Sequence, residues 1–205
     1  MENIKLSEFT IEKIKNREFE KSIPELYELE KVIQNNPWHD NDSVFNHTLS
    51  VVMELNNLLG TVSNKIKKYL DYKIKNYSRK GLLILAAIFH DIAKKETRNE
   101  ALFLGHEEIG AEKLRNIIPR FDLAEKEKEF VVKLVANHGF IHYILNYPID
   151  KPEEKWRKFK EKNPDIYIVV ALLTKADTSV SHLKNSKPKE FSFRINFIDK
   201  IIDSY

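Results

Sequence analysis

The sequence predicts an all-α fold for this chain of 205 residues. Only five Gly and seven Pro interrupt it, and no strictly alternating apolar run is bounded by hairpin turns, so strands should be scarce. Apolar residues instead recur three, four and seven positions apart, which is the spacing of one helix face. A hydrophobic content of 42% is enough for the core of one compact domain.

The candidate helices follow this periodicity, and several carry start signals. Ser78 precedes an apolar run, Asp122 is expected to cap the charged segment AEKEKEF, and Pro164 stands at the first turn of another helix. Helices are expected over residues 7–20, 24–34, 43–60, 62–76, 78–93, 106–118, 124–138, 153–161, 164–183 and 191–203. Connections are expected at 35–42, 95–105, 147–152 and 185–189.

No composition shift marks a boundary, so we expect a single domain over residues 1–205. Within it we expect a helical N-terminal extension to about residue 36, a core over 37–183 and a C-terminal helix over 184–205. The charged N-terminus does not read as a signal peptide, and the longest apolar runs, 82–89 and 166–173, are far shorter than the ~20 residues of a membrane helix. These features favour a cytoplasmic protein without a membrane partner.

The charges are interleaved, and their sum is only +3. A pI near 8.8 permits a polyanionic partner such as RNA without requiring one. The densest basic stretch, residues 64–80, is more typical of an amphipathic helix that exposes its lysines than of a nucleic-acid groove.

Polar residues with metal-binding side chains lie on apolar helix faces. Each shares its face with apolar residues three, four or seven positions away, strongly for His47, His90, His138 and Asp177 and more weakly for His106. One such histidine is usually a hydrogen-bonded core residue. Several imidazoles and carboxylates facing one core, however, are most cheaply satisfied by a shared cation. Because Cys is absent, imidazole and carboxylate must supply the ligands.

The doublet His90-Asp91 ends the apolar run 82–89, where a helix can deliver both side chains to one metal. A second doublet, His39-Asp40, lies in a predicted loop without apolar register and is given no ligand role. His142 and His182 are interpreted as ordinary polar residues near helix ends or on the surface.

These residues resemble the pattern of the HD-domain superfamily of metal-dependent phosphohydrolases, which is a His, a His-Asp doublet and a distant Asp. The segments PWHDNDSVFNHTLSVV, FLGHEEIGAEKL, FVVKLVANH and LLTKADTS further resemble, in order, the HD domain of bacterial CCA-adding tRNA nucleotidyltransferases. The likeness covers roughly residues 37–181. The chain has no room for that enzyme's nucleotidyltransferase head and neck, so only a stand-alone HD module is implied.

The resemblance implies an HD-domain bundle of roughly eight to ten helices around a metal site. It implies one metal on His47, His90, Asp91 and Asp177, and either a second metal on Asp91, His106 and His138 or substrate contacts from these two histidines. In the family an HDxxK lysine, here Lys94, contacts substrate phosphate; the alternative is a solvated lysine at a helix C-terminus. HDIAK lacks the Glu-Asp of guanosine-tetraphosphate hydrolases, which argues against that activity.

The expected function is therefore hydrolysis of a phosphate ester of a nucleotide or nucleic-acid end, of the 2′,3′-cyclic phosphodiesterase, nucleotidase or phosphatase type. Asp91 and Lys94 are the expected catalytic residues. The cofactor is one or two divalent metals per chain, from Mn, Fe, Co, Ni and Zn, with Mg also possible. A dinucleoside polyphosphate or deoxynucleotide hydrolase stays open, as does an RNA-binding or regulatory module with a structural metal.

Overall fold

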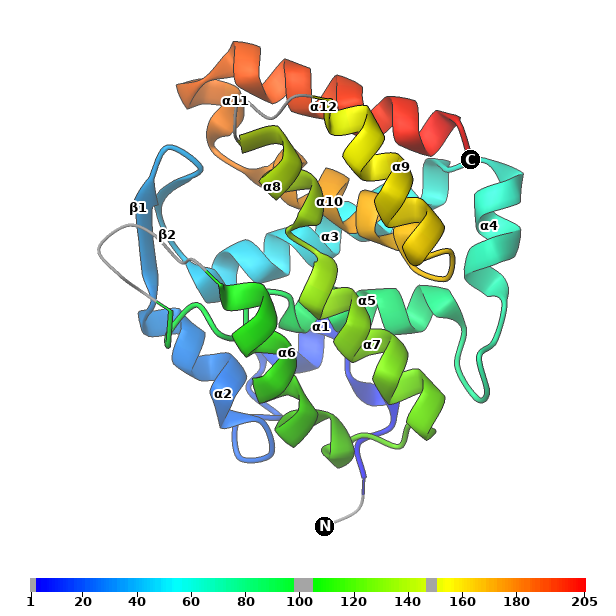
Figure 1. Ribbon diagram of the computed structural model, residues 1–205. Helices are drawn as coiled ribbons and strands as arrows, with labels where there is room; N and C mark the ends of the chain where they lie inside the picture. The colour runs from blue at the N-terminus through cyan, green and yellow to red at the C-terminus, as the bar shows by residue number, and fades with distance from the viewer. Residues whose placement is uncertain (1–2, 98–104, 147–150) are drawn as a thin grey trace.

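The computed structural model describes residues 3–97, 105–146 and 151–205 (Figure 1). Its elements are α1 (Ile11–Lys15), α2 (Pro24–Tyr27), β1 (Ile33–Asn36), β2 (His39–Ser43), α3 (Val44–Thr61), α4 (Asn64–Asp71), α5 (Arg79–Phe89), α6 (His106–Ile117), α7 (Glu125–Asn137), α8 (Phe140–Asn146), α9 (Pro152–Lys162), α10 (Tyr167–Val180), α11 (Leu183–Ser186) and α12 (Pro188–Asp203). Short 3₁₀ turns occupy Leu6–Glu8, Glu28–Lys31 and Ile118–Arg120. The predicted all-α fold is confirmed, with one small hairpin added.

Three apolar helices form the centre of the bundle. Helix α3 packs against α10 and α5, α5 packs against α7, and α10 also packs against α12 (Figure 1). Residues 85–89 of α5 are at most 2% exposed, because the second half of this helix is surrounded on all sides. Its start agrees with the prediction, since the Ser78 hydroxyl accepts a hydrogen bond from the backbone N–H of Gly81. The end of α5 therefore delivers the next residues, His90 and Asp91, into the interior.

The hairpin of β1 and β2 occupies the loop expected at 35–42 and also the adjoining ends of the helices expected over 24–34 and 43–60. Its two strands pair antiparallel, with Ile33 opposite Ser43 and a register shift between Gln34 and Asn35. The strand residues IQNN and HDNDS are mostly polar, so they show none of the alternation from which strands are predicted. Figure 1 shows the hairpin at one side of the bundle, beside the start of α3.

Other boundaries also differ from the prediction. Helix α8 was not expected, because seven residues are too few for a periodic signal. Asp122 is not the cap of α7, which has Ala124 at that position; the buried Glu127 carboxylate accepts the Ala124 N–H at 2.9 Å. Pro164 lies before α10 rather than in its first turn, since α10 begins at Tyr167. Parts of two expected connections, 98–104 and 147–150, lie outside the described residues.

The N-terminal residues pack into the same core as the bundle. Phe9 is 4% exposed and its ring contacts those of Phe89 and Phe121 at centroid distances of 6.0 and 5.0 Å. Ile14 and Ile23 are fully buried in the same cluster. The proposed division into extension, core and C-terminal helix stays a prediction.

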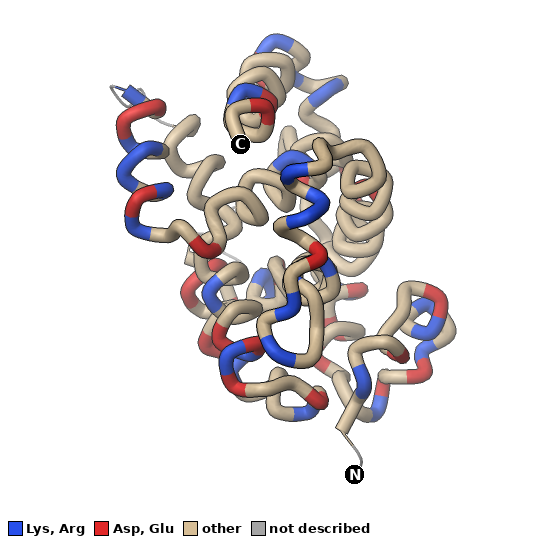
Figure 2. The backbone as a smooth tube through the Cα atoms, turned by 90° about the vertical axis from the view of Figure 1, so that its right-hand side faces the viewer, with Lys and Arg blue, Asp and Glu red and all other residues tan. Residues whose placement is uncertain are grey.

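Residues of both charges occur side by side in many segments of the chain. Figure 2 shows Lys and Arg alternating with Asp and Glu along the backbone, as the interleaved sequence predicts. Among the helices in the described ranges, none combines the length and the apolar character needed to span a bilayer.

Candidate metal centre

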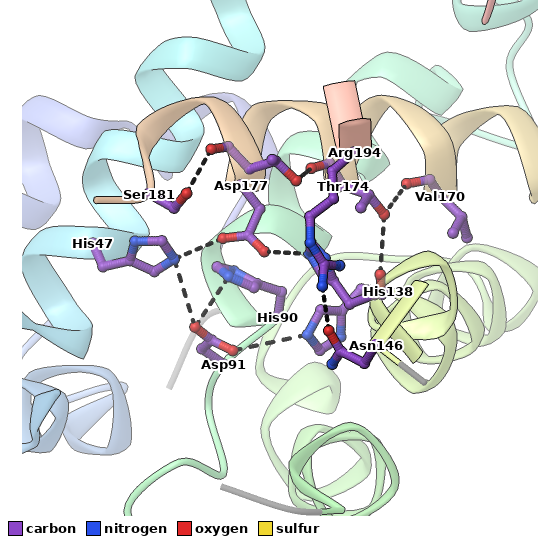
Figure 3. Close-up of polar contacts among 12 residues, drawn as sticks. His47, His90, Asp91, His138, Asn146, Val170, Thr174, Asp177, Ser181 and Arg194 are labelled. Atoms are coloured by element: carbon purple, nitrogen blue, oxygen red, sulfur yellow. Dashed lines mark hydrogen bonds and ion pairs between the residues drawn. The ribbon is translucent and has the colours of Figure 1, made fainter. Parts of the chain in front are cut away.

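Six residues predicted to bind metal or substrate come together in the interior. They are contributed by α3, by the residues that follow α5 and α7, by the first residue of α6 and by α10, and they are His47, His90, Asp91, His106, His138 and Asp177. Figure 3 shows Asp91 between His47 and His90 on one side and His138 on the other. The predicted histidine stripes are confirmed as buried, with His47, His90 and His138 at 3%, 0% and 4% exposure.

One group of donors surrounds Oδ2 of Asp91. Nε2 of His90 lies 3.1 Å from this oxygen, and Nε2 of His47 lies 3.9 Å from it. One ligand atom from each of these three residues can be chosen so that all lie within 4.8 Å of one another, so they could hold one cation. Asp177 lies beside this group, with its Oδ1 2.8 Å from Nε2 of His47.

A second group surrounds the other oxygen of the same carboxylate. Oδ1 of Asp91 lies 3.2 Å from Nε2 of His106 and 3.8 Å from Nε2 of His138. The two histidine nitrogens are 3.2 Å apart. These three residues also have ligand atoms within 4.8 Å of one another. Asp91 therefore belongs to both groups and faces each with a different oxygen.

Two of the histidines have their tautomers fixed by helix ends. His90 and His138 are the residues at which α5 and α7 end, and there the carbonyls of the last turn lack intrahelical donors. Nδ1–H of His90 donates to the Ala87 carbonyl, and Nδ1–H of His138 donates to the Val135 carbonyl, both at 2.7 Å. In the neutral rings Nε2 then carries the lone pair. Nε2 of His90 is buried and, although it lies 3.1 Å from Oδ2 of Asp91, it makes no hydrogen bond of suitable geometry with any described residue, so its lone pair is available to a cation.

The charges of the centre favour ligand forms of its side chains. Burial alone would raise the pKa of Asp91, but His90 and Lys94 hold it well below its usual range. In the same way, His142 and His47 hold the pKa of Asp177 well below its usual range. Burial, with His106 and His90 nearby, holds the pKa of His138 well below its usual value. Both carboxylates are therefore ionised and His138 is neutral at pH 7.

The pKa of His90 is shifted in the opposite direction to that of His138. Burial opposes protonation of His90, but the adjacent Asp91 carboxylate outweighs burial and raises the pKa of His90. A cation that binds His90 must therefore compete with a proton, which makes metal binding dependent on pH.

Lys94 is part of the centre rather than a solvated lysine. Its side chain is 9% exposed, and Nζ lies 2.7 Å from Oδ2 of Asp91. The same ammonium donates at 2.7 Å to Oε1 of Gln34 on β1, a residue that is fully buried. The hairpin thus fixes the lysine beside the doublet.

Several residues around the ligands were not found from the sequence. His142, interpreted as an ordinary polar residue, shares a hydrogen bond of 2.9 Å between its Nε2 and Oδ2 of Asp177. His39, for which the sequence predicts no ligand role, packs its ring on that of His47 with centroids 4.5 Å apart. Burial, with His47 and Lys94 nearby, lowers the pKa of His39 to about 3. Both histidines stand in segments without apolar periodicity, so the sequence carries no signal for their inward direction.

A carboxylate also supports His106. Oε2 of Glu107 lies 3.4 Å from Nδ1 of His106, on the side of the ring opposite to Asp91. Such a partner orients a metal-binding histidine and raises its basicity. Gly139 leaves room for this carboxylate, because a Cβ there would lie 2.0 Å from Oε1 of Glu107.

The fold and this centre define an all-α protein with a buried cluster of histidine and aspartate side chains. The HD domain family model matches residues 44–179, which is most of the chain and includes all six clustered residues. The chain therefore belongs to the HD domain family. Membership indicates metal-dependent phosphohydrolase activity and hence a phosphate-ester substrate.

Proposed function

We propose that this protein hydrolyses a phosphate ester of a nucleotide or a nucleic-acid end at a centre of two divalent metals bridged by Asp91. The observation that carries the proposal is the division of one buried carboxylate between two histidine groups, with Oδ2 facing His47 and His90 and Oδ1 facing His106 and His138. Each oxygen thus faces two imidazoles, which is the arrangement expected of a carboxylate shared by two cations.

The first metal would be held by His47, His90, Asp91 and Asp177. The second would be held by Asp91, His106 and His138. Two nitrogens that bind one cation at about 2.1 Å lie about 3.0 Å apart at a right angle and about 3.4 Å apart at the tetrahedral angle. The 3.2 Å between Nε2 of His106 and Nε2 of His138 falls between these values. Imidazoles and carboxylates without thiolate suit Mn, Fe, Co, Ni or Zn.

When bound, such cations lower the pKa of a water molecule and neutralise negative charge on a phosphoryl group. The chain contributes the remaining functions. Lys94 carries a positive charge that Asp91 and Gln34 hold in one place, so it is positioned to contact a phosphoryl oxygen. The buried imidazoles and the surrounding apolar helices keep bulk water away from these charges and so strengthen their interactions.

The ester itself is open to a direct test. A panel of 2′,3′-cyclic nucleotides, nucleoside monophosphates, deoxynucleotides and dinucleoside tetraphosphates, assayed with Mn²⁺, Ni²⁺, Co²⁺ and Mg²⁺, separates the proposed activities from the alternative hydrolases. The likeness to the HD domain of CCA-adding enzymes motivates adding a tRNA 3′ end to the panel. Binding of RNA that weakens steeply with salt, without turnover of any substrate, would instead support the regulatory module.

Substitution of the bridging residue tests the mechanism. Asp91→Ala should abolish turnover and remove both metals, measured by elemental analysis of protein purified without chelator. Asp122→Ala, which changes an exposed residue in the loop before α7, is the matched control and should keep both the turnover and the bound metals. His106→Ala and His138→Ala should each lose one equivalent of metal. Full activity of Asp91→Ala would rule out the mechanism, and unchanged stoichiometry in both histidine variants would leave one metal only.

A further inference from the structure

A polar pocket adjoins the metal centre and is not explained by metal binding. It has a volume of about 380 Å³, within the range of small-molecule sites. Residues 38–42 of the hairpin and His47 form one wall, and residues 180–182 and Asn185, at the end of α10 and in α11, form the other. Since His47 belongs to both, a ligand in the pocket lies next to the centre.

The lining selects against phosphate. It contains the carboxylates of Asp40 and Asp42 and the amides of Asn41 and Asn185, and none of its described residues is Lys or Arg. His182, on the far wall, already faces Oδ2 of Asp40 at 4.0 Å. Carboxylates accept hydrogen bonds from hydroxyl groups but repel a phosphate. The pocket therefore suits an uncharged, hydroxyl-bearing part of a substrate.

The pocket wall is held in place without a ligand. The backbone N–H of His182 donates to the Trp38 carbonyl at 2.7 Å, and the Ser186 hydroxyl donates to the Pro37 carbonyl at 2.6 Å. The Trp38 ring packs on His142 with centroids 5.1 Å apart, and the guanidinium of the buried Arg194 lies 4.7 Å from the Trp38 ring centre. A wall fixed by these contacts loses little conformational freedom when a ligand binds.

We propose that this pocket binds the vicinal diol of a ribonucleoside whose single phosphate lies at the metal centre. The inference rests on the proposed function and narrows its substrate to a ribonucleoside 5′-monophosphate. A 2′,3′-cyclic nucleotide has no free diol and a 2′-deoxynucleotide has lost one hydroxyl, so neither carries the group that the pocket would bind. A site that pairs a hydroxyl discriminates strongly against the analogue without it.

Equilibrium binding tests the pocket independently of catalysis. Calorimetry with metal-loaded protein should show binding of adenosine or uridine and at least tenfold weaker binding of their 2′-deoxy forms. Asp40→Ala should weaken binding of the ribonucleosides about tenfold, the loss expected for one hydrogen bond to a charged group. The control Asp122→Ala has the same change of charge on another part of the surface and should bind like wild type. Equal affinity for both sugars, no binding at millimolar nucleoside, or no effect of Asp40→Ala overturns the proposal.

Steady-state kinetics then distinguishes binding of the ribose in the pocket from ester hydrolysis at the metal centre. Asp40→Ala should lower kcat/KM for a ribonucleoside 5′-monophosphate, mainly through KM, about tenfold more than kcat/KM for p-nitrophenyl phosphate, because that ester has no diol. An equal loss for both esters would mean that Asp40 acts on the fold and would overturn the assignment. Turnover of p-nitrophenyl phosphate without nucleoside binding refutes the pocket alone. Nucleoside binding without turnover of any ester refutes the proposed function alone.

Discussion

Gly139 allows a test of how the second half of the centre is supported. Gly139 has no positive φ, so alanine is compatible with its backbone. The new Cβ would lie 2.0 Å from Oε1, 2.9 Å from Cδ and 3.1 Å from Cγ of Glu107, and no side chain tolerates such contacts. The Glu107 side chain is 27% exposed and can move into solvent, which ends its 3.4 Å contact with Nδ1 of His106. Loss of such a partner typically weakens metal binding about 10–100-fold.

In the proposed two-metal centre, Gly139→Ala should therefore weaken binding of the metal at His106 and His138 by about 10–100-fold and leave binding of the other metal unchanged. Because Glu107 moves toward water, the free energy of unfolding of the metal-free protein should change by less than about 1 kcal/mol. Titration against a competing chelator measures both affinities, and urea unfolding measures stability. Gly60→Ala is the matched control, since a Cβ there meets nothing within 4 Å. If Gly139→Ala binds both metals like wild type, Glu107 does not support His106.

Two further predictions concern stability. The fully buried Glu127 carboxylate accepts hydrogen bonds from the N–H groups of Asn76, Tyr77 and Ala124 at 2.6, 2.7 and 2.9 Å. Glu127→Ala should therefore lower the free energy of unfolding, measured in urea, by about 3 kcal/mol or more without changing the metal stoichiometry. A loss of less than about 1 kcal/mol would contradict this. The pKa of His39 is about 3 in the folded protein and about 6.5 in the unfolded chain. Below pH 6.5 the unfolded state therefore binds a proton at His39 that the folded state does not, and the free energy of unfolding decreases as the pH is lowered. When the pH is lowered from 6.5 to 5.5, the free energy of unfolding of the metal-free wild type should decrease by about 1 kcal/mol more than that of His39→Phe, which keeps a ring against His47. Equal decreases in the two proteins would show that His39 titrates normally.

The sequence predicts the buried histidines of the cluster well because long helices carry a strong periodic signal. His47, His90 and His138 share helix faces with apolar residues, and this register is enough to predict that all three are buried. The apolar run 82–89 also predicts that the doublet enters the core, but α5 ends at Phe89 rather than at the expected residue 93. The positions of the ligands along the chain are thus set by local patterns that any one helix displays.

The residues around the ligands could not be predicted in the same way. Trp38 and His39 stand in a polar hairpin whose inward faces are defined only by the bundle against which it packs. His142 stands on a helix of seven residues, and its direction depends on how that helix crosses α10. Glu107 belongs to the segment FLGHEEIGAEKL, but nothing local in that segment predicts its contact with His106, which depends on a glycine 32 positions later. These are tertiary effects without a local pattern.

The long separation of the ligands along the chain affects the kinetics of folding. His47 and Asp177 are 130 residues apart, yet their side chains lie 2.8 Å from each other. Contacts between such distant residues are slow to form, since a long loop must close first. The complete centre therefore does not exist until α3 and α10 have packed, and a cation cannot guide the early steps. Bound metal should act mainly by slowing the opening of the folded chain, so it prolongs the lifetime of the native state and hardly changes the rate at which that state is reached.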